Sequence, residues 1–520
     1  MGEGQTLKEL FRKEFPKHDP TPAEERLLNE IGTGDVIDLC PSDVDSDCDP
    51  GQADTWGPER TMSAAVLGWL CTDREASRFI SRKGIQIRGA RIVGRLDLES
   101  ADLPYQMALT NCRCEAEILL RGAHVKELSL SSSHTRSINL EGAKIEGGVF
   151  LNEGFKAQGE VGLLGATLGG QLNCSGGELV NPGGNALSAD EAKIEGHVFL
   201  DEGFKAQGEV RLLGATVGGQ LICSGGELVN PGGNALFANG AKIEGGVFLD
   251  EGFKARGRIS LVSATVEGFF NLRDVAEPEG LSLDLESAAV GTLSDEQDSW
   301  PPNGQLWLDG FTCTRIARDA PRDGKSRVRW LRLQPQDEIH PQPYEFLART
   351  LAEAGAIRAA RNVGMAKSWD TRKARCRKVG FAPLRWVRRA WDLFLRVAFG
   401  YGYRLWATWV ALALAFFIAG VVVFDRASSR GIIMQMSPPQ TALERVEETS
   451  WLTPPRFHPV LYSLDLLLPI PLGFEEQWQS DETQRWGFTV SCFSIGLIVA
   501  GWVLAALGTA TATGVLQRRI

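Results

Sequence analysis

One carboxylate in a strongly apolar stretch is the residue most able to do chemistry in this sequence. Asp465 lies at the centre of HPVLYSLDLLLPIPLGF, residues 458–474, in which most side chains are apolar. An ionisable group in such surroundings is costly to bury and commonly belongs to a functional site. Pro469 and Pro471 interrupt helix there, and the stretch is too short to cross a bilayer. We therefore expect a re-entrant or interfacial segment with Asp465 as its functional group.

Two other patterns allow a metal interpretation. The alternating aspartates of residues 43–49 could bind calcium, but the glycine and the distal glutamate of an EF-hand loop are missing. A solvated acidic loop is therefore favoured. Cys174 and Cys223 occupy equivalent positions with no second ligand type beside them, which favours buried small hydrophobes over a metal-binding ladder. An external aromatic ladder is expected from three equivalent residues: Phe155, Phe204 and Phe253.

Signals for an enzyme are weak. His124, His134 and His197 have no evident acid or cysteine partner at catalytic spacing. None of the glycine pairs precedes Lys-Ser/Thr or opens a helix, so no nucleotide-binding loop is indicated. The ten cysteines show no zinc spacing and no disulfide framework, and they fit a reducing compartment. We expect no catalytic residues, no metal and no cofactor.

The elements that must position these residues are dominated by a repeat. AKIEGGVFL begins at Ala143 and Ala241, and the variant AKIEGHVFL begins at Ala192, so the period is 49 residues. Each period contains two shorter units with apolar residues at alternate positions around a glycine. Alternation of this kind predicts short, half-buried strands, and a fixed period predicts stacked coils.

We therefore predict a right-handed parallel β-helix, a pentapeptide-like solenoid, over residues 83–315. Its terminal coils should be irregular, since they cover the ends of the stack. Residues 1–80 are expected to form an α-helical N-terminal cap. Thr21-Pro-Ala-Glu24 has the residues of a helix start, and a second helix is expected from Pro58 to Leu70.

The chain after the β-helix should be helical. Residues 316–342 are polar and proline-containing, and we expect a linker there. Residues 343–404 should form an αα-hairpin, interrupted at Gly355, that docks on the β-helix or on a neighbouring subunit and continues into a basic juxtamembrane helix. A lone hairpin of this kind cannot bury its own apolar face.

Two apolar runs are long enough to cross a membrane. Residues 405–424 contain no charge, and an uncharged run from Trp486 extends through residues 486–515. The second run carries small residues that would let helices approach closely, either in another chain or within one chain: Gly496, Gly501, Ala505 and Gly508. Thr509 and Thr513 add hydroxyls near its end.

Flanking charges predict the orientation. Residues 372–404 carry ten basic side chains and one acid, whereas the loop 425–485 has nine acids and five bases. The positive-inside rule therefore places both termini and the β-helix in the cytoplasm. Arg385, Arg388 and Arg389 would face anionic lipid. The net charge of −10 argues against general nucleic-acid binding.

Three stretches together resemble a family of bacterial membrane-anchored, pentapeptide-like repeat proteins, some of which are labelled membrane-associated oxidoreductase. These are TWGPERTMSAAVLGWL with GIQIRGARIVGRLDLESADL, the AKIEGGVFL repeats, and YSLDLLLPIPLGFEEQW with GWVLAALGTATATGVLQRR. The resemblance implies a multi-pass protein of the bacterial inner membrane. No flavin, nicotinamide, haem or CxxC motif supports the oxidoreductase label. The C-terminal layout also resembles two-helix ion channels, without the potassium filter TVGYG.

Two functions remain open from the sequence. The first is an oligomeric pore, expected to be tetrameric and cation-conducting, that is gated through the cytoplasmic β-helix by an unknown ligand or protein. Its candidate pore residues are Asp465, Pro469, Glu475, Glu476, Thr509 and Thr513. The alternative is a membrane-anchored scaffold whose β-helix binds protein partners while the spans only tether it.

Overall fold

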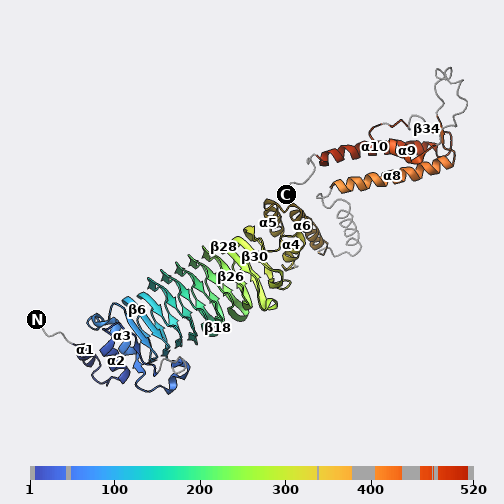
Figure 1. Ribbon diagram of the computed structural model, residues 1–520. Helices are drawn as coiled ribbons and strands as arrows, with labels where there is room; N and C mark the ends of the chain where they lie inside the picture. The colour runs from blue at the N-terminus through green and yellow to red at the C-terminus, as the bar shows by residue number, and fades with distance from the viewer. Residues whose placement is uncertain are drawn as a thin grey trace. The chain divides into compact units, whose positions relative to one another are not determined.

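The computed structural model describes residues 6–41, 48–335, 339–377, 405–435, 457–470, 472–473 and 478–512. The chain divides into two compact units, Met1–Lys367 and Ser368–Ile520. The first unit is a parallel β-solenoid with helices at its two ends, and the second contains the apolar helices (Figure 1).

The solenoid has about 10 turns and two long parallel sheets. The repeat aligns in register: β12 (Lys144–Ile145) pairs with β16 (Thr167–Leu168), which pairs with β19 (Lys193–Ile194). Two rungs therefore correspond to one 49-residue period, and the two units predicted in each period are both coils. Each short strand finds its backbone partners on the coils before and after it, so stacking satisfies groups that an isolated coil would leave open.

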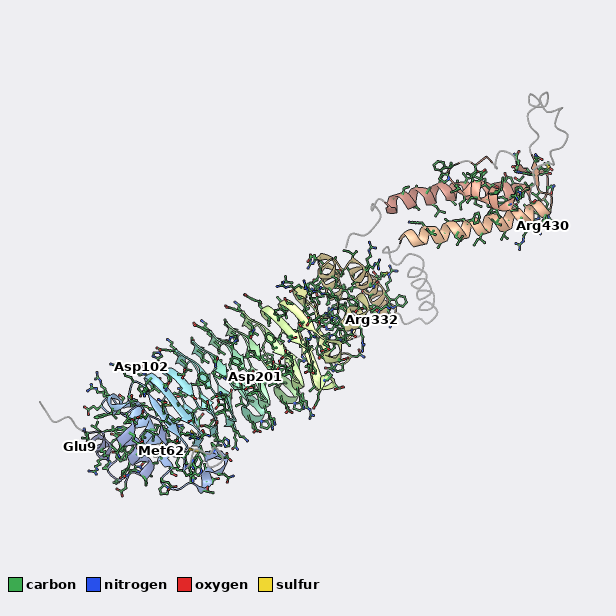
Figure 2. The ribbon with its side chains drawn as sticks, viewed as in Figure 1. Glu9, Met62, Asp102, Asp201, Arg332 and Arg430 are labelled. Atoms are coloured by element: carbon green, nitrogen blue, oxygen red, sulfur yellow. A yellow bond between two sulfur atoms is a disulfide. The ribbon has the colours of Figure 1, made fainter. Side chains whose placement is uncertain are left out.

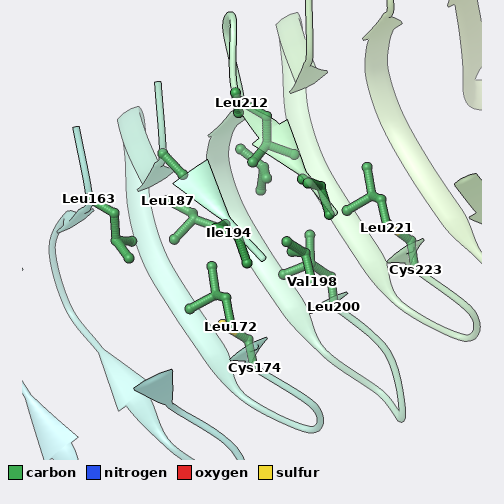
Figure 3. Packing of buried hydrophobic residues seen from close by; sticks show 14 of the residues in the cluster. Leu163, Leu172, Cys174, Leu187, Ile194, Val198, Leu200, Leu212, Leu221 and Cys223 are labelled. Atoms are coloured by element: carbon green, nitrogen blue, oxygen red, sulfur yellow. The ribbon is translucent and has the colours of Figure 1, made fainter. Parts of the chain in front are cut away.

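Equivalent positions on successive coils build the core. Leu172, Val198 and Leu221 lie in one register, and Cys174, Leu200 and Cys223 lie in the next inward position (Figure 3). Both cysteines are fully buried, as the sequence predicted, and burial raises the pKa of the Cys174 thiol to about 12. Because Leu200 stands between them, the two thiols do not form an adjacent pair.

The aromatic ladder is internal, so the prediction of an external one is wrong. Three phenylalanines are fully buried on equivalent coils: Phe155, Phe204 and Phe253. Each follows a Glu-Gly pair with positive φ; for example, Glu153 has φ 55° and Gly154 has φ 85°. This left-handed pair reverses the direction of the chain, so the next side chain points into the coil. A simple alternation of apolar and polar residues does not predict such a corner.

The N-terminal segment is not purely helical. It contains α1 (Leu7–Glu14), α2 (Pro22–Glu30) and α3 (Ala64–Thr72). The predicted capping box is present, with Thr21 and Glu24 each bonded to the other's backbone N–H. The second helix begins at Ala64 rather than Pro58, since the residues before it form a strand.

Two strands of this segment extend the solenoid. β1 (Ile37–Asp38) pairs with β3 (Ile85–Arg88), and β2 (Thr61–Ser63) pairs with β4 (Arg91–Val93). The predicted boundary near residue 83 is therefore too late. Buried Glu24 ties the helices to this edge, because its carboxylate accepts the Ser63 N–H at 2.8 Å.

Cys40 and Cys48 form a disulfide with Cα atoms 5.5 Å apart, contrary to the expectation that the chain has no disulfide framework. A separation of eight residues does not by itself indicate a disulfide, so the sequence did not reveal this pair. The predicted acidic loop, residues 43–49, lies mostly outside the described residues. Asp49 is described, and its side chain accepts the Gly51 N–H at the start of η2 (Pro50–Thr55).

The segment 316–342 is not a linker throughout. It contains α4 (Gly324–Leu331), whose Trp330 and Leu331 are buried against the last coils. Arg327 is completely buried and donates to both carboxylate oxygens of Asp295, at 2.7 and 2.8 Å. The polar composition of this segment suggested a linker. Arg327 can nevertheless be buried, because Asp295 accepts two hydrogen bonds from its guanidinium.

The predicted αα-hairpin is confirmed. It consists of α5 (Gln342–Glu353) and α6 (Ile357–Arg377), separated by Gly355 at φ 78°. Helix α5 packs on β32 (Thr312–Ile316), and the rings of Phe311 and Phe346 meet edge to face at 6.1 Å. The apolar face of the hairpin therefore packs on the solenoid of the same chain, which is one of the two expected arrangements.

We predict that Asp295→Ala destabilises the last coils by about 3–5 kcal/mol, because it leaves a buried guanidinium without its carboxylate. Hydrogen exchange of peptides covering residues 289–331 measures this loss. Replacing both partners, Asp295→Leu with Arg327→Met, should restore part of the protection. Asp309→Ala, which removes a half-exposed carboxylate nearby, is the matched control and should change exchange little. Equal effects of the Asp295 and Asp309 variants would contradict this role.

Candidate functional site: a short helix between two apolar helices

Two long helices frame the second unit. α8 (Leu405–Ser429) and α10 (Gly487–Ala512) contain segments long and apolar enough to cross a membrane, Trp409–Ser429 and Gly487–Ala510. Both agree with the predicted spans, and α8 continues five residues past the predicted end at 424. Most of their described side chains are exposed or half-buried within the single chain.

A third, shorter helix lies between them. α9 (Pro459–Leu467) begins with proline at its first position and contacts both long helices. Its Tyr462, Ser463 and Leu466 are buried, and the Tyr462 ring meets Phe424 of α8 edge to face at 4.9 Å. The apolar stretch 458–474 is therefore a helix followed by a non-helical segment.

Two glycines make room for α9. A Cβ added at Gly420 of α8 would stand 3.1 Å from Ser463 Oγ and 3.2 Å from its Cβ. A Cβ added at Gly501 of α10 would overlap the carbonyl oxygen of Leu467. Gly501 was predicted to pack against another helix, and its neighbour is α9. Gly420 was missed, although a lone glycine in an apolar helix commonly marks close approach.

The same contacts give the depth of α9. Gly420 lies nine residues before the end of α8, and Gly501 lies 14 residues after the start of α10. With about 1.5 Å per residue, Ser463 lies about 14 Å from the end of α8, next to β33 (Ile433–Gln435). Leu467 lies about 21 Å from the start of α10, next to β34 (Trp478–Ser480). The difference of about 7 Å agrees with the ~6 Å that four helical residues span. α9 therefore runs from the end of α8 and the start of α10 toward the middle of both helices. We call its Leu467 end the inner end of α9.

A small antiparallel sheet lies beside the end of α8 and the start of α10. β33 (Ile433–Gln435) follows α8 and pairs with β34 (Trp478–Ser480), which precedes α10. Phe457, just before α9, lies 5.3 Å from both the Tyr462 and Trp478 rings. The chain therefore enters and leaves the α9 segment at this one end.

Asp465 is 4% exposed, so the predicted functional carboxylate lies inside the helix cluster. Its Oδ1 accepts the Leu472 N–H at 2.5 Å. The carboxylate thereby holds the segment that returns from the inner end of α9. It lies in the last turn of α9, two residues before Leu467, where carbonyl oxygens already concentrate negative potential.

The returning segment, which we define as the described residues 468–470 and 472–473, is apolar and largely open to solvent within the described part of the chain. Leu468, Ile470 and Leu472 are 41%, 66% and 45% exposed. Pro469, another predicted site residue, is partly buried and prevents further helix. The described part of the molecule thus leaves an apolar, non-helical strip beside the inner end of α9.

The remaining predicted residues are dispersed. Thr509 is exposed, and its hydroxyl donates to Ala505 and Ala506 carbonyls of its own helix at 3.1 and 2.8 Å. A Cβ at Gly496 or Gly508 would meet no atom within 4 Å. Six predicted residues lie outside the residues or side chains that the structure describes: Arg385, Arg388, Arg389, Glu475, Glu476 and Thr513.

The histidines of the solenoid were thought to lack acidic partners, and one has two. His124 Nδ1 lies 3.1 Å from Asp102, and Nε2 lies 3.2 Å from Glu146. The three residues stand on successive rungs, about 22 residues apart, which linear spacing does not show. All three are exposed, and no nucleophilic side chain is bonded to them in the described solenoid, so we assign them to a surface ladder.

No protein-family model, curated protein or solved structure matches this chain.

We predict that Gly501→Ala displaces α9, whereas Gly496→Ala does not, because only the first added methyl meets backbone. Ser463→Cys in a Cys376→Ser/Cys492→Ser background reports the change, since Ser463 is fully buried. Maleimide should label Cys at 463 slowly in the parent and in Gly496→Ala, and at least several-fold faster in Gly501→Ala. Equal labelling in all three would show that the glycine is not needed for packing.

Proposed function

We propose that the protein is an oligomeric membrane channel that conducts cations and is controlled by its β-solenoid. The observation that carries this proposal is the returning segment, which is non-helical, apolar and exposed beside the inner end of α9. In a bilayer, such backbone is tolerated only where protein covers it or where it lines a water-filled cavity. Within the described residues, a single chain covers α9 on the side of α8 and α10 and leaves the side chains of the returning segment exposed.

Symmetric assembly meets this requirement. If α8 and α10 span the membrane, the inner end of α9 lies about 21 Å into a hydrocarbon core of about 30 Å. Copies arranged around an axis would cover the returning segments of one another and surround a central path. We favour a tetramer, because two spans per chain cannot enclose a conduit alone.

The charge pattern at the inner end of α9 favours cations. The helix C-terminus carries partial negative charge, Asp465 lies two residues from it, and Glu475 and Glu476 follow in the sequence. Acidic groups at a pore mouth select for cations. Thr509 and Thr513 would lie toward the opposite mouth.

The proposal also specifies the location and orientation of the protein in the membrane. Positive flanks place both termini in the cytoplasm of a bacterium, with two passes through the inner membrane. The solenoid would be right-handed, with the N-terminal helices as its cap, as the resemblance to membrane-anchored pentapeptide-like repeat proteins implies. Opening requires a ligand or partner that binds one state of the cytoplasmic part more tightly than the other.

A tethered scaffold is the second candidate, and the regular solenoid face favours it. Lys144, Thr167, Lys193, Thr216 and Lys242 alternate along one register. A flat ladder of this kind could bind a protein partner. Replacing α8 through α10 by an unrelated two-span anchor distinguishes the two: a scaffold keeps its cellular activity, and a channel loses it.

Recording of the purified full-length protein in planar bilayers tests the channel. We expect discrete cation-selective currents, and lower conductance or selectivity in Asp465→Asn, because asparagine keeps an acceptor for the Leu472 N–H but removes the charge. Asp481→Asn, an exposed carboxylate between β34 and α10, is the control and should change the current less. Unaltered currents in Asp465→Asn would contradict the role of this residue.

A further inference from the structure

A pocket of about 270 Å³ lies between the end of α8 and the start of α10, and its lining has two chemical parts. One part is cationic: Arg426 belongs to the last turn of α8, and Arg430 follows that helix directly (Figure 2). The other part is apolar and comes from both helices and from the turn after α8. It includes Val423, Ala427, Ile432, Trp486, Val490 and Phe493. The pocket therefore joins two guanidinium groups to an apolar groove.

The groove changes from polar to apolar along the two helices. Val423 lies six residues before the end of α8, and Phe493 lies six residues after the start of α10. With about 1.5 Å per residue, both lie about 9 Å from those helix ends. Trp486, which is 53% exposed, directly precedes α10. In a bilayer, arginine and tryptophan at the end of a span lie among the headgroups, whereas the lining further in meets acyl chains.

Backbone hydrogen bonds hold the walls of the groove together. The turn after α8 is closed by the Ile432 N–H, which donates to the Ala427 carbonyl at 3.0 Å. The Ile432 carbonyl accepts the Asp481 N–H at 2.8 Å. Gln484 Nε2, just before α10, donates to the Gly431 carbonyl at 3.0 Å. The two sides are therefore fixed before any ligand binds, which lowers the cost of binding.

The two arginines are unexpected at this end of the helices. In the proposed orientation the end faces away from the cytoplasm, whereas the positive-inside rule concentrates cations on the cytoplasmic side. Orientation therefore does not account for Arg426 and Arg430, and an anionic ligand does. A guanidinium has five N–H donors, so each arginine can bind a phosphate even where it also meets a carboxylate.

We propose that this groove binds one anionic phospholipid, with the phosphate at Arg426 and Arg430 and part of an acyl chain along Val423 and Phe493. The planar fork of arginine matches the oxygens of a phosphate. Basic pockets between membrane-spanning helices are known to take lipid headgroups. The volume is slightly below that of most small-molecule pockets, so the groove takes the phosphate and the first part of one chain.

The site rests on the proposed crossing of the membrane by α8 and α10, and it does not depend on conduction. A lipid in this groove touches both long helices at the end where the chain enters and leaves the α9 segment. Because a ligand that binds the folded state stabilises it, the lipid strengthens the helix cluster around Asp465. The anionic lipid content of the membrane then controls the stability of this cluster.

Native mass spectrometry of the detergent-solubilised full-length protein tests the site with phosphatidylglycerol as the probe. We expect one molecule per chain to bind more tightly than phosphatidylethanolamine, which has no net charge. Arg426→Gln with Arg430→Gln should raise the Kd for phosphatidylglycerol by about tenfold or more, since two charge-assisted contacts are lost. Arg485→Gln, the control, removes an exposed arginine at the same end outside the pocket lining and should leave Kd unchanged.

A second pair of variants tests the groove without changing its charge. Thr489→Trp fills the groove from an exposed lining position and should also weaken phosphatidylglycerol binding. Ile495→Trp, on an exposed part of α10 outside the lining, should not. Glycerol 3-phosphate, a phosphate without acyl chains, should bind far more weakly than the lipid. Hydrogen exchange over residues 420–435 and 481–493 checks that the variants keep the fold.

Three results would overturn the site: no tightly bound phosphatidylglycerol, equal Kd in the parent and the double arginine variant, or glycerol 3-phosphate binding as tightly as the lipid. Release of the protein from membranes by alkaline carbonate would overturn the crossing itself, and the channel with it. Arginine-dependent lipid binding by a protein that carries no current would support the site and count against the channel alone.

Discussion

Backbone polar groups cannot be left bare in hydrocarbon, and this constraint decides how the C-terminal unit can work. α9 enters between α8 and α10 because Gly420 and Gly501 leave room for it. Its inward course then forces the chain to return as a non-helical segment, since Pro469 ends the helix. Asp465 satisfies one N–H of that return, but no described residue of the single chain covers its exposed apolar side chains. The need for another copy follows from this geometry if the helices span a membrane.

The solenoid obeys the same requirement in water by a different route. Each coil satisfies its neighbour, so the difficulty is confined to the two ends of the stack. At one end, β1 and β2 add rungs and Glu24 ties the helices to them. At the other, Asp295 binds Arg327 and Trp300 and so fixes α4 over the last coils. This buried ion pair therefore holds α4 against the last coils of the solenoid.

Much of the fold could be predicted because its information is local or periodic. The 49-residue period aligns strands by simple offset, and uncharged runs reveal the long helices without any tertiary contact. The features that were missed depend on pairing across coils or between helices. His124 meets Asp102 and Glu146 one coil away, Arg327 meets Asp295 across 32 residues, and the phenylalanines turn inward at a corner that alternation does not describe. Asp465 was identified as a candidate by its apolar surroundings, whereas its partner Leu472 required the return of the chain.

Cross-linking at the returning segment tests the central claim most directly. Ile470, which is 66% exposed, would become cysteine in a Cys376→Ser/Cys492→Ser background, and membranes containing the full-length protein would be oxidised. Coverage of one copy by another predicts covalent dimers at dilute protein-to-lipid ratios, with Trp502→Cys on the exposed face of α10 as a control that cross-links less. Monomers only at position 470, with that cysteine labelled by a lipid-soluble maleimide, would contradict the account.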